Sequence, residues 1–121
     1  MKQIDKKDKI GFQAAVKGIV FTGKGGNFKI MGIIGVIALI LSAILNLSNI
    51  EWSLIILCIT IVLTAEAINT AIELICDYVN PHYHSNIGRI KDISAGAVLI
   101  SSIGAAITGA LIFGPYLARL L

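Results

Sequence analysis

Apolar positions gather in long uninterrupted blocks along this chain. No charged residue occurs at positions 30–47, 52–65 or 93–118, and the apolar pattern of the second block continues past a few polar positions to residue 76. At about 1.5 Å of rise per residue, about 20 helical residues cross a hydrocarbon core of roughly 30 Å. The pattern therefore predicts three membrane-spanning helices, at about 30–48, 52–77 and 93–118.

The segment before the first span has a mixed pattern. Apolar residues at 10, 12, 14, 16 and 19–21 are interleaved with polar residues at 9, 13 and 17. Such a mixture suits a helix that lies in the membrane surface, so we predict a surface helix over about 8–22. The stretch TGKGGN at 22–27 then predicts a flexible bend. A phosphate cradle is the alternative interpretation, but the Gly-Lys-Ser/Thr ending of the Walker pattern is absent.

Composition supports a single all-α membrane domain covering residues 1–121. Hydrophobic residues make up 56% of the chain and charged residues 14%, against about 25% charged in soluble domains. The length suits one domain. Cys58 and Cys76 stand eighteen residues apart on the second span, too far to bridge within one helix, so both are expected to be free thiols.

The distribution of charge predicts the orientation. The net charge is +3, and seven of the ten Lys and Arg residues precede position 30. The loop between the first two spans contains neither Lys nor Arg, which places it outside and the N-terminus in the cytoplasm, as expected of a plasma membrane protein. The basic residues are expected to face anionic lipid, because nothing beside them resembles a nucleic-acid-binding module.

Four polar residues interrupt the second span near its cytoplasmic end. They are Glu66, Asn69, Glu73 and Asp77, spaced i, i+3, i+7 and i+11, so they project within about 80° of one another on a helix. Carboxylates inside a span are costly and are functional candidates by default. Snorkelling to the interface explains Asp77 well and Glu66 poorly, because Glu66 lies two to three turns deeper.

Stacked carboxylates at a membrane edge suggest two kinds of chemistry. They can hold a hard cation such as Mg²⁺, or a deep carboxylate can accept a proton as a base. Lys91 and Asp92 stand at the cytoplasmic start of the third span, where a lysine can pair with a phosphate. His82 and His84 form a metal-like His-x-His pair, although solvated loop histidines are the favoured interpretation.

These residues also carry a family resemblance. Positions 65–73 (AEAINTAIE), Asp77, the Tyr-His pair at 83–84 and positions 88–98 (GRIKDISAGAV) resemble the signature of the prokaryotic diacylglycerol kinase and undecaprenol kinase family. The resemblance implies a homotrimer of three-span subunits that transfers the γ-phosphate of Mg-ATP to the hydroxyl of a membrane lipid. It also implies active sites shared between neighbouring subunits at the cytoplasmic surface.

The resemblance assigns roles to individual residues. Glu66 is expected to be the general base, Asn69 to help position the lipid hydroxyl, and Glu73 to bind the metal ion. Nucleotide contacts are expected from Lys17, Asp77, Tyr83, His84, Lys91 and Asp92. His82 stands where family members often carry glutamate, so no role is carried over to it.

One position departs from the family pattern. The family has a glutamate just before the first span as a second metal ligand, and here Gly25 takes that place, between Lys24 and Gly26. The loss of one anionic ligand is expected to weaken Mg²⁺ binding, although ATP phosphates supply other ligands.

Three functions therefore stay open. The leading one is a lipid kinase, with undecaprenol favoured over diacylglycerol because the KDISAGAV run looks more like that of Gram-positive undecaprenol kinases. A catalytically impaired homologue acting as a membrane partner is kept open by the glycine-rich TGKGG segment. A small proton- or ion-conducting oligomer would use Glu66 and Glu73 as a relay. A relay requires polar groups through the whole membrane depth, and here they occupy only the cytoplasmic half of the second span.

Overall fold

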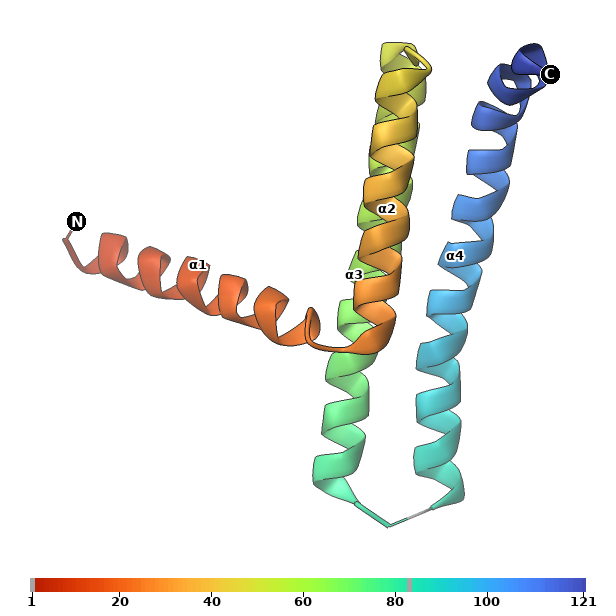
Figure 1. Ribbon diagram of the computed structural model, residues 1–121. Coiled ribbons are helices and arrows are strands. Elements are labelled where there is room, and N and C mark those ends of the chain that lie inside the picture. The colour runs from red at the N-terminus through yellow and green to blue at the C-terminus, as the bar shows by residue number, and fades with distance from the viewer. Residues whose placement is uncertain (1, 83) are drawn as a thin grey trace.

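The computed structural model describes residues 2–82 and 84–121, with side chains described from residue 10 onward. The described residues form four helices, α1 (Lys2–Thr22), α2 (Gly26–Ile44), α3 (Asn49–Val79) and α4 (Ser85–Leu120). In Figure 1, α2, α3 and α4 run side by side, while α1 leaves them at a steep angle. The most extensive packing joins α3 to α4; α2 packs on α3, and α1 touches α3. The predicted all-α class is confirmed.

The three long helices differ in length, and this difference creates the site. All three are long and apolar enough to cross a membrane. The 19 residues of α2 span about 28 Å, whereas the 31 residues of α3 and the 36 of α4 span about 46 Å and 54 Å. A hydrocarbon core is about 30 Å thick, so α3 and α4 are longer than the membrane requires. Figure 1 shows the excess at the end where α3 and α4 join, beyond the start of α2.

A double cap makes the tight turn between α2 and α3. Asn46 has a φ of 53°, and the Leu47 N–H donates to the Ser42 carbonyl at 3.3 Å, which is the arrangement that ends many helices. Ser48 and Glu51 then form a reciprocal capping box at the start of α3. As a result α2 ends at Ile44, short of the position 48 that apolarity alone indicates.

The bend between α1 and α2 is well defined. The backbone N–H groups of residues 23–25 each donate to a carbonyl in the last turn of α1, at 2.9 to 3.1 Å. These donors are therefore already used, which argues against a phosphate cradle at this point. Gly25 caps α2 in an extended conformation, without a side-chain hydrogen bond.

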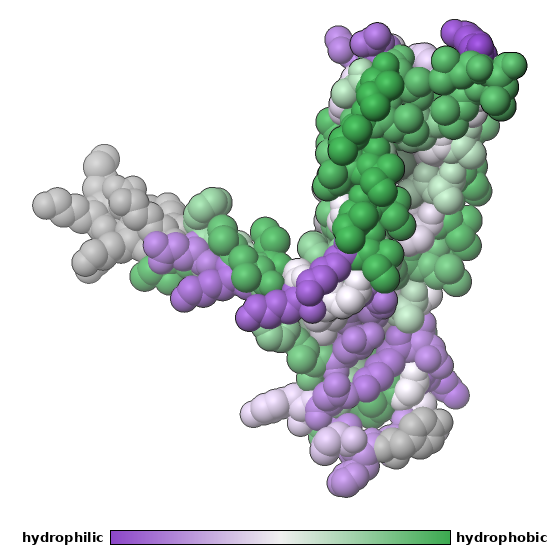
Figure 2. All heavy atoms as spheres, viewed as in Figure 1, coloured by the Kyte–Doolittle hydropathy of each residue, from purple (hydrophilic) through white to green (hydrophobic). Residues whose placement is uncertain are grey.

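Few side chains are buried within one chain. The buried apolar residues of the described part are Leu47, Ile55, Cys76, Val98 and Ile112. Figure 2 shows apolar surface along most of the three spans and polar surface at their ends, most of it around the C-terminal end of α3 and the N-terminal end of α4, which are called the inner ends below. Apolar surface of this extent is typical of a protein whose solvent is the bilayer. Cys58 and Cys76 are free thiols, as expected.

Candidate active site at the inner end of α3 and α4

One face of α3 carries the four predicted polar residues. Helix α3 is continuous from Asn49 to Val79, so Glu66, Asn69, Glu73 and Asp77 do share a face. Glu66 and Asn69 are each only 5% exposed, whereas the two acids nearer the helix end are exposed.

The depth of these residues follows from the rise of the helix. Tryptophan is enriched at membrane–water interfaces, and measured from Trp52 near the start of α3, Glu66 lies about 21 Å along the helix and Glu73 about 32 Å. With a core of roughly 30 Å, Glu66 lies just inside the hydrocarbon and Glu73 at its boundary. The face therefore connects lipid to water.

Asn69 and Glu73 interact directly. The Asn69 Nδ2 donates to Glu73 Oε1 at 3.1 Å, across one helical turn. The Asn69 Oδ1 is buried and has no hydrogen-bond partner among the described atoms. An unpaired buried acceptor costs about 1–3 kcal/mol, so a donor brought by a substrate would be stabilising there.

Lys91 joins α4 to the acidic face. It forms an ion pair with Asp77, which is the one ion pair among the side chains that the structure describes. The two side chains are 37% and 61% exposed, so both remain accessible from water. This contact places the start of the third span beside the end of the second.

The loop between α3 and α4 uses its polar groups locally. His84 caps α4, because its Nδ1 accepts a hydrogen bond from the Asn86 N–H at 3.1 Å, and its Nε2 forms no hydrogen bond within the described residues. Asn80 Oδ1 accepts from the His82 N–H. No group of three or more His, Cys, Asp or Glu side chains suited to a metal occurs within residues 10–82 and 84–121, so nothing supports the His-x-His metal site.

Two further predicted residues, Lys17 and Asp92, do not join this group. Lys17 lies on α1, which points away from the other helices (Figure 1). Asp92 is exposed and forms no ion pair in the described part of the chain. Tyr83 lies outside the described residues.

One polar residue escaped the sequence analysis. Ser102 lies on α4 among apolar neighbours that line a groove between α2, α3 and α4. The sequence did contain one indication of its position. Ser102 stands eleven residues after Lys91, about three helical turns, so the two residues lie on the same face of the helix.

The metal-binding capacity of the described chain is limited. Mg²⁺ in nucleotide sites is often held by one or two carboxylates together with substrate phosphates. Glu73 fits this role, since it is exposed to water beside the orphaned Asn69 oxygen. The residues therefore fit an ion that arrives with a nucleotide, and they do not form a metal cage of their own.

Fold and site together define an integral membrane protein with a charged centre at one membrane boundary, reachable from lipid and from water. Its relationships agree with this class. The prokaryotic diacylglycerol kinase pattern matches residues 13–113, and the chain belongs to that family. It is therefore a lipid kinase, a transferase, as the sequence signature predicted.

Several relatives are similar over most of the chain. A diacylglycerol kinase from Escherichia coli (strain K12) is 31% identical over 106 residues, covering 81% of this chain and 87% of the relative. An undecaprenol kinase from Bacillus subtilis (strain 168) is 36% identical over 91 residues, covering 75% and 74%. A diacylglycerol kinase from Synechocystis is 34% identical over 96 residues, covering 78% and 55%. Because relatives with similar sequence identity to this chain are named for different lipids, membership of the family does not identify the lipid substrate.

Proposed function

We propose that this protein transfers the γ-phosphate of Mg-ATP to the hydroxyl group of undecaprenol at the cytoplasmic face of the plasma membrane. In this reaction a bond forms between the alcohol oxygen and the γ-phosphorus. The bond from that phosphorus to the β,γ-bridging oxygen breaks, and ADP leaves. The observation that carries the proposal is the position of Glu66, a carboxylate buried at the lipid boundary of a face that continues into water.

Glu66 acts as the general base. Its carboxylate takes the hydroxyl proton as the alcohol oxygen attacks, and proton transfer of this kind contributes about 10²–10⁴-fold to a rate. No cation pairs with Glu66 among the described side chains, so the carboxylate remains available to the alcohol. Its depth matches that of a lipid hydroxyl at the edge of the hydrocarbon.

Asn69 and Glu73 organise the phosphate side of the reaction. Asn69 holds Glu73 through its amide N–H and presents its unpaired oxygen to a donor on the substrate. Glu73 is the side chain that would hold Mg²⁺, which when bound neutralises charge on the ATP phosphates.

The nucleotide is held from the water side. Lys91 is oriented by Asp77 and pairs with phosphate oxygens, and the free Nε2 of His84 is available as a further contact. Lys17, Tyr83 and Asp92 are proposed as additional nucleotide contacts on the family resemblance alone. Phosphoryl transfer depends mainly on positioning and charge stabilisation, which is what these groups provide.

The assembly and orientation are also proposed. We infer a homotrimer on the family resemblance alone. The N-terminus is placed in the cytoplasm, because the basic residues gather at that end. The choice of undecaprenol over diacylglycerol rests on the KDISAGAV run at 91–98.

A direct assay tests the function. Purified protein in lipid vesicles is incubated with Mg-ATP labelled in the γ-phosphate and with either undecaprenol or diacylglycerol, and labelled lipid is measured. Wild type is expected to label undecaprenol faster, and Glu66→Gln to lose at least about 100-fold in kcat. Absence of labelled lipid from properly assembled wild-type protein would refute the kinase, whereas faster labelling of diacylglycerol would refute only the choice of lipid.

Gly25 supports a second candidate, a catalytically impaired homologue. The position is exposed at the start of α2 and carries no carboxylate, so the family's second acidic ligand is missing from this chain. The same assay separates the two, because an impaired homologue assembles and binds lipid without turnover. The ion-conducting alternative is disfavoured, since positions 52–65 of α3 hold no charged residue.

A further inference from the structure

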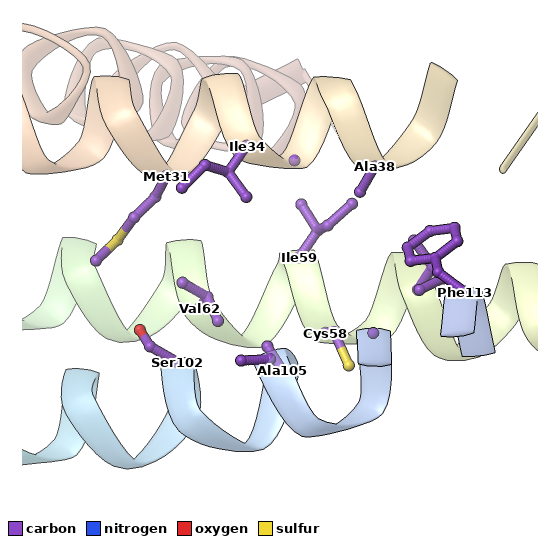
Figure 3. A pocket seen from close by; sticks show the side chains of 13 residues that line it. Met31, Ile34, Ala38, Cys58, Ile59, Val62, Ser102, Ala105 and Phe113 are labelled. Carbon is purple, nitrogen blue, oxygen red and sulfur yellow. The ribbon is translucent and has the colours of Figure 1, made fainter. Parts of the chain in front are cut away.

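A groove runs along the membrane-embedded part of the molecule between α2 and α4, with α3 as its floor. Its volume is about 340 Å³, within the range of sites that bind small organic molecules. Figure 3 shows Met31, Val62 and Ser102 at one end and Ala38 and Phe113 at the other. Because Met31 lies near the start of α2, the first of these ends faces the candidate active site.

The groove continues directly into that site. Val62 lines its inner end, and Glu66 is the residue one helical turn further along α3. Residues four apart lie on the same helical face, so the apolar floor leads onto the acidic face without interruption.

The register of α3 against α4 brings Ser102 level with Glu66. Two contacts fix that register, Lys91 with Asp77 at the inner end and Tyr116 with Glu51 at the outer end. Eleven residues along each helix from the inner pair lead from Asp77 to Glu66 and from Lys91 to Ser102. Eleven residues make about three turns, so both side chains stay on the facing sides.

Helix geometry also directs the two side chains toward each other. Side chains lean toward the N-terminus of their own helix. For Glu66 on α3 this is the outer direction, toward the groove, and for Ser102 on the antiparallel α4 it is the inner direction, toward Glu66. Figure 3 shows the Ser102 oxygen pointing toward α3 at the inner end of the groove.

The Ser102 hydroxyl is available for a ligand. The neighbouring hydroxyls of Ser101 and Thr108 donate to carbonyls of their own helix at 2.9 Å. Ser102 makes no such bond within the described chain, although it lies on the same helix. The groove thus offers one free hydroxyl at one end of an otherwise mainly apolar channel.

We infer that this groove binds the hydrocarbon chain of the lipid alcohol. The Ser102 hydroxyl donates a hydrogen bond to the alcohol oxygen, and the hydroxyl proton of the alcohol faces Glu66. This inference rests on the proposed function and adds the binding site of the lipid chain to it. A ligand with one polar end and one hydrocarbon chain matches the groove. The single free hydroxyl of the groove, Ser102, lies at the end nearest Glu66, and the floor of the groove is only one helix wide. Ser102 would then orient a lone pair of the alcohol toward the phosphate.

The first test concerns Ser102. Ser102→Ala is expected to lower kcat/KM for the lipid about tenfold, the effect of one lost hydrogen bond to a substrate, with KM for ATP unchanged. Ser102→Thr, which keeps the hydroxyl, should retain most of the activity. Ser101→Ala is the matched control, since that hydroxyl bonds its own helix, and should behave as wild type. Equal losses in Ser102→Ala and Ser102→Thr, or no loss in either, would overturn the role of the hydroxyl.

The second test concerns the groove. Ala105→Leu fills its middle, whereas Ala110→Leu adds the same bulk at an exposed position of α4 outside it. With isoprenoid alcohols of increasing length, Ala105→Leu should react normally with the shortest and lose at least about tenfold in kcat/KM with the longest. Ala110→Leu should follow wild type at every length.

Three outcomes are distinguishable. A length-dependent loss supports the inference. A loss that is equal at all lengths, together with a changed particle mass for Ala105→Leu, would assign the groove to a subunit contact and overturn it. Wild-type protein that phosphorylates no alcohol at any length fails the proposed function itself, before the groove is tested.

Discussion

Lys91 and Asp77 form an ion pair whose value lies in function and not in stability. Both side chains are partly exposed, and pairs of this kind contribute about 0–1 kcal/mol to folding. Lys91→Ala is therefore expected to change the unfolding midpoint little, yet to lower kcat/KM for ATP at least about tenfold through the lost phosphate contact. Arg89→Ala, which removes an exposed cation of the same helix, is the control and should leave both unchanged. Equal effects of the two variants would mean that Lys91 contributes only general positive charge.

Gly25 is the residue where a substitution is expected to strengthen Mg²⁺ binding. Its φ of −74° and ψ of 141° are open to any residue, and a Cβ there would lie 3.3 Å from the Thr22 carbonyl oxygen, which requires only a small shift. Gly25→Glu is expected to lower the half-saturating Mg²⁺ concentration several-fold, because a carboxylate ligand is added. Gly26→Glu, where a Cβ meets nothing within 4 Å, adds the same charge one residue later. If Mg²⁺ titrations of both variants match wild type, this segment does not reach the metal.

Single-helix geometry explains which site residues were predictable. The common face of Glu66, Asn69, Glu73 and Asp77 follows from the helical period alone, so it was visible in the sequence. The unpaired Asn69 oxygen and the level of Ser102 depend on how α4 lies against α3. That register is determined by the contacts between α3 and α4 at both helix ends, which no periodicity encodes.

At the scale of elements, α3 and α4 are tied at both ends by polar contacts. The outer contact is a hydrogen bond from the Tyr116 hydroxyl to Glu51 Oε1 at 2.7 Å, with Arg119 5.9 Å above the tyrosine ring. Since Glu51 also caps α3, one carboxylate both starts that helix and holds α4 to it. The contact lies across the membrane from the proposed chemistry.

Tyr116→Phe separates this structural contact from catalysis. The variant removes one hydrogen bond to a carboxylate, so unfolding in mixed detergent should become easier by about 1–3 kcal/mol, with kcat close to wild type below the unfolding range. Tyr78→Phe, at a tyrosine that is 93% exposed, should change neither. A large loss of kcat in folded Tyr116→Phe would show that the outer ends of the helices control the inner site.

Element boundaries were less predictable than element types. Long charge-free blocks identify spans, because lipid tolerates few charges, and all three predicted spans fall on long helices. Charge-free length says nothing about where a helix stops once it leaves lipid. Helix α4 begins at Ser85, ahead of the expected span start at 93, because its His84 cap lies in water.

For the whole molecule, the steep angle of α1 has a consequence for the proposed trimer. Helix α1, which includes Lys17, leaves the other helices at a steep angle (Figure 1). In a closed ring of three subunits every chain has a neighbour on each side, so a helix that leaves its own bundle can lie against the next subunit. Lys17 is therefore expected to serve the nucleotide site of a neighbouring subunit.

Mixing two defective subunits tests this arrangement. Glu66→Gln and Lys17→Ala should each be strongly impaired as pure assemblies. When equal amounts are unfolded together and reassembled, a site shared between neighbours receives both intact residues in about one quarter of cases by random association, so activity should recover to about a quarter of wild type. If both residues act from the same chain, no mixed assembly contains an intact site and activity stays at the level of the pure variants. Full activity of the Lys17→Ala variant alone would instead show that Lys17 is not part of the nucleotide site.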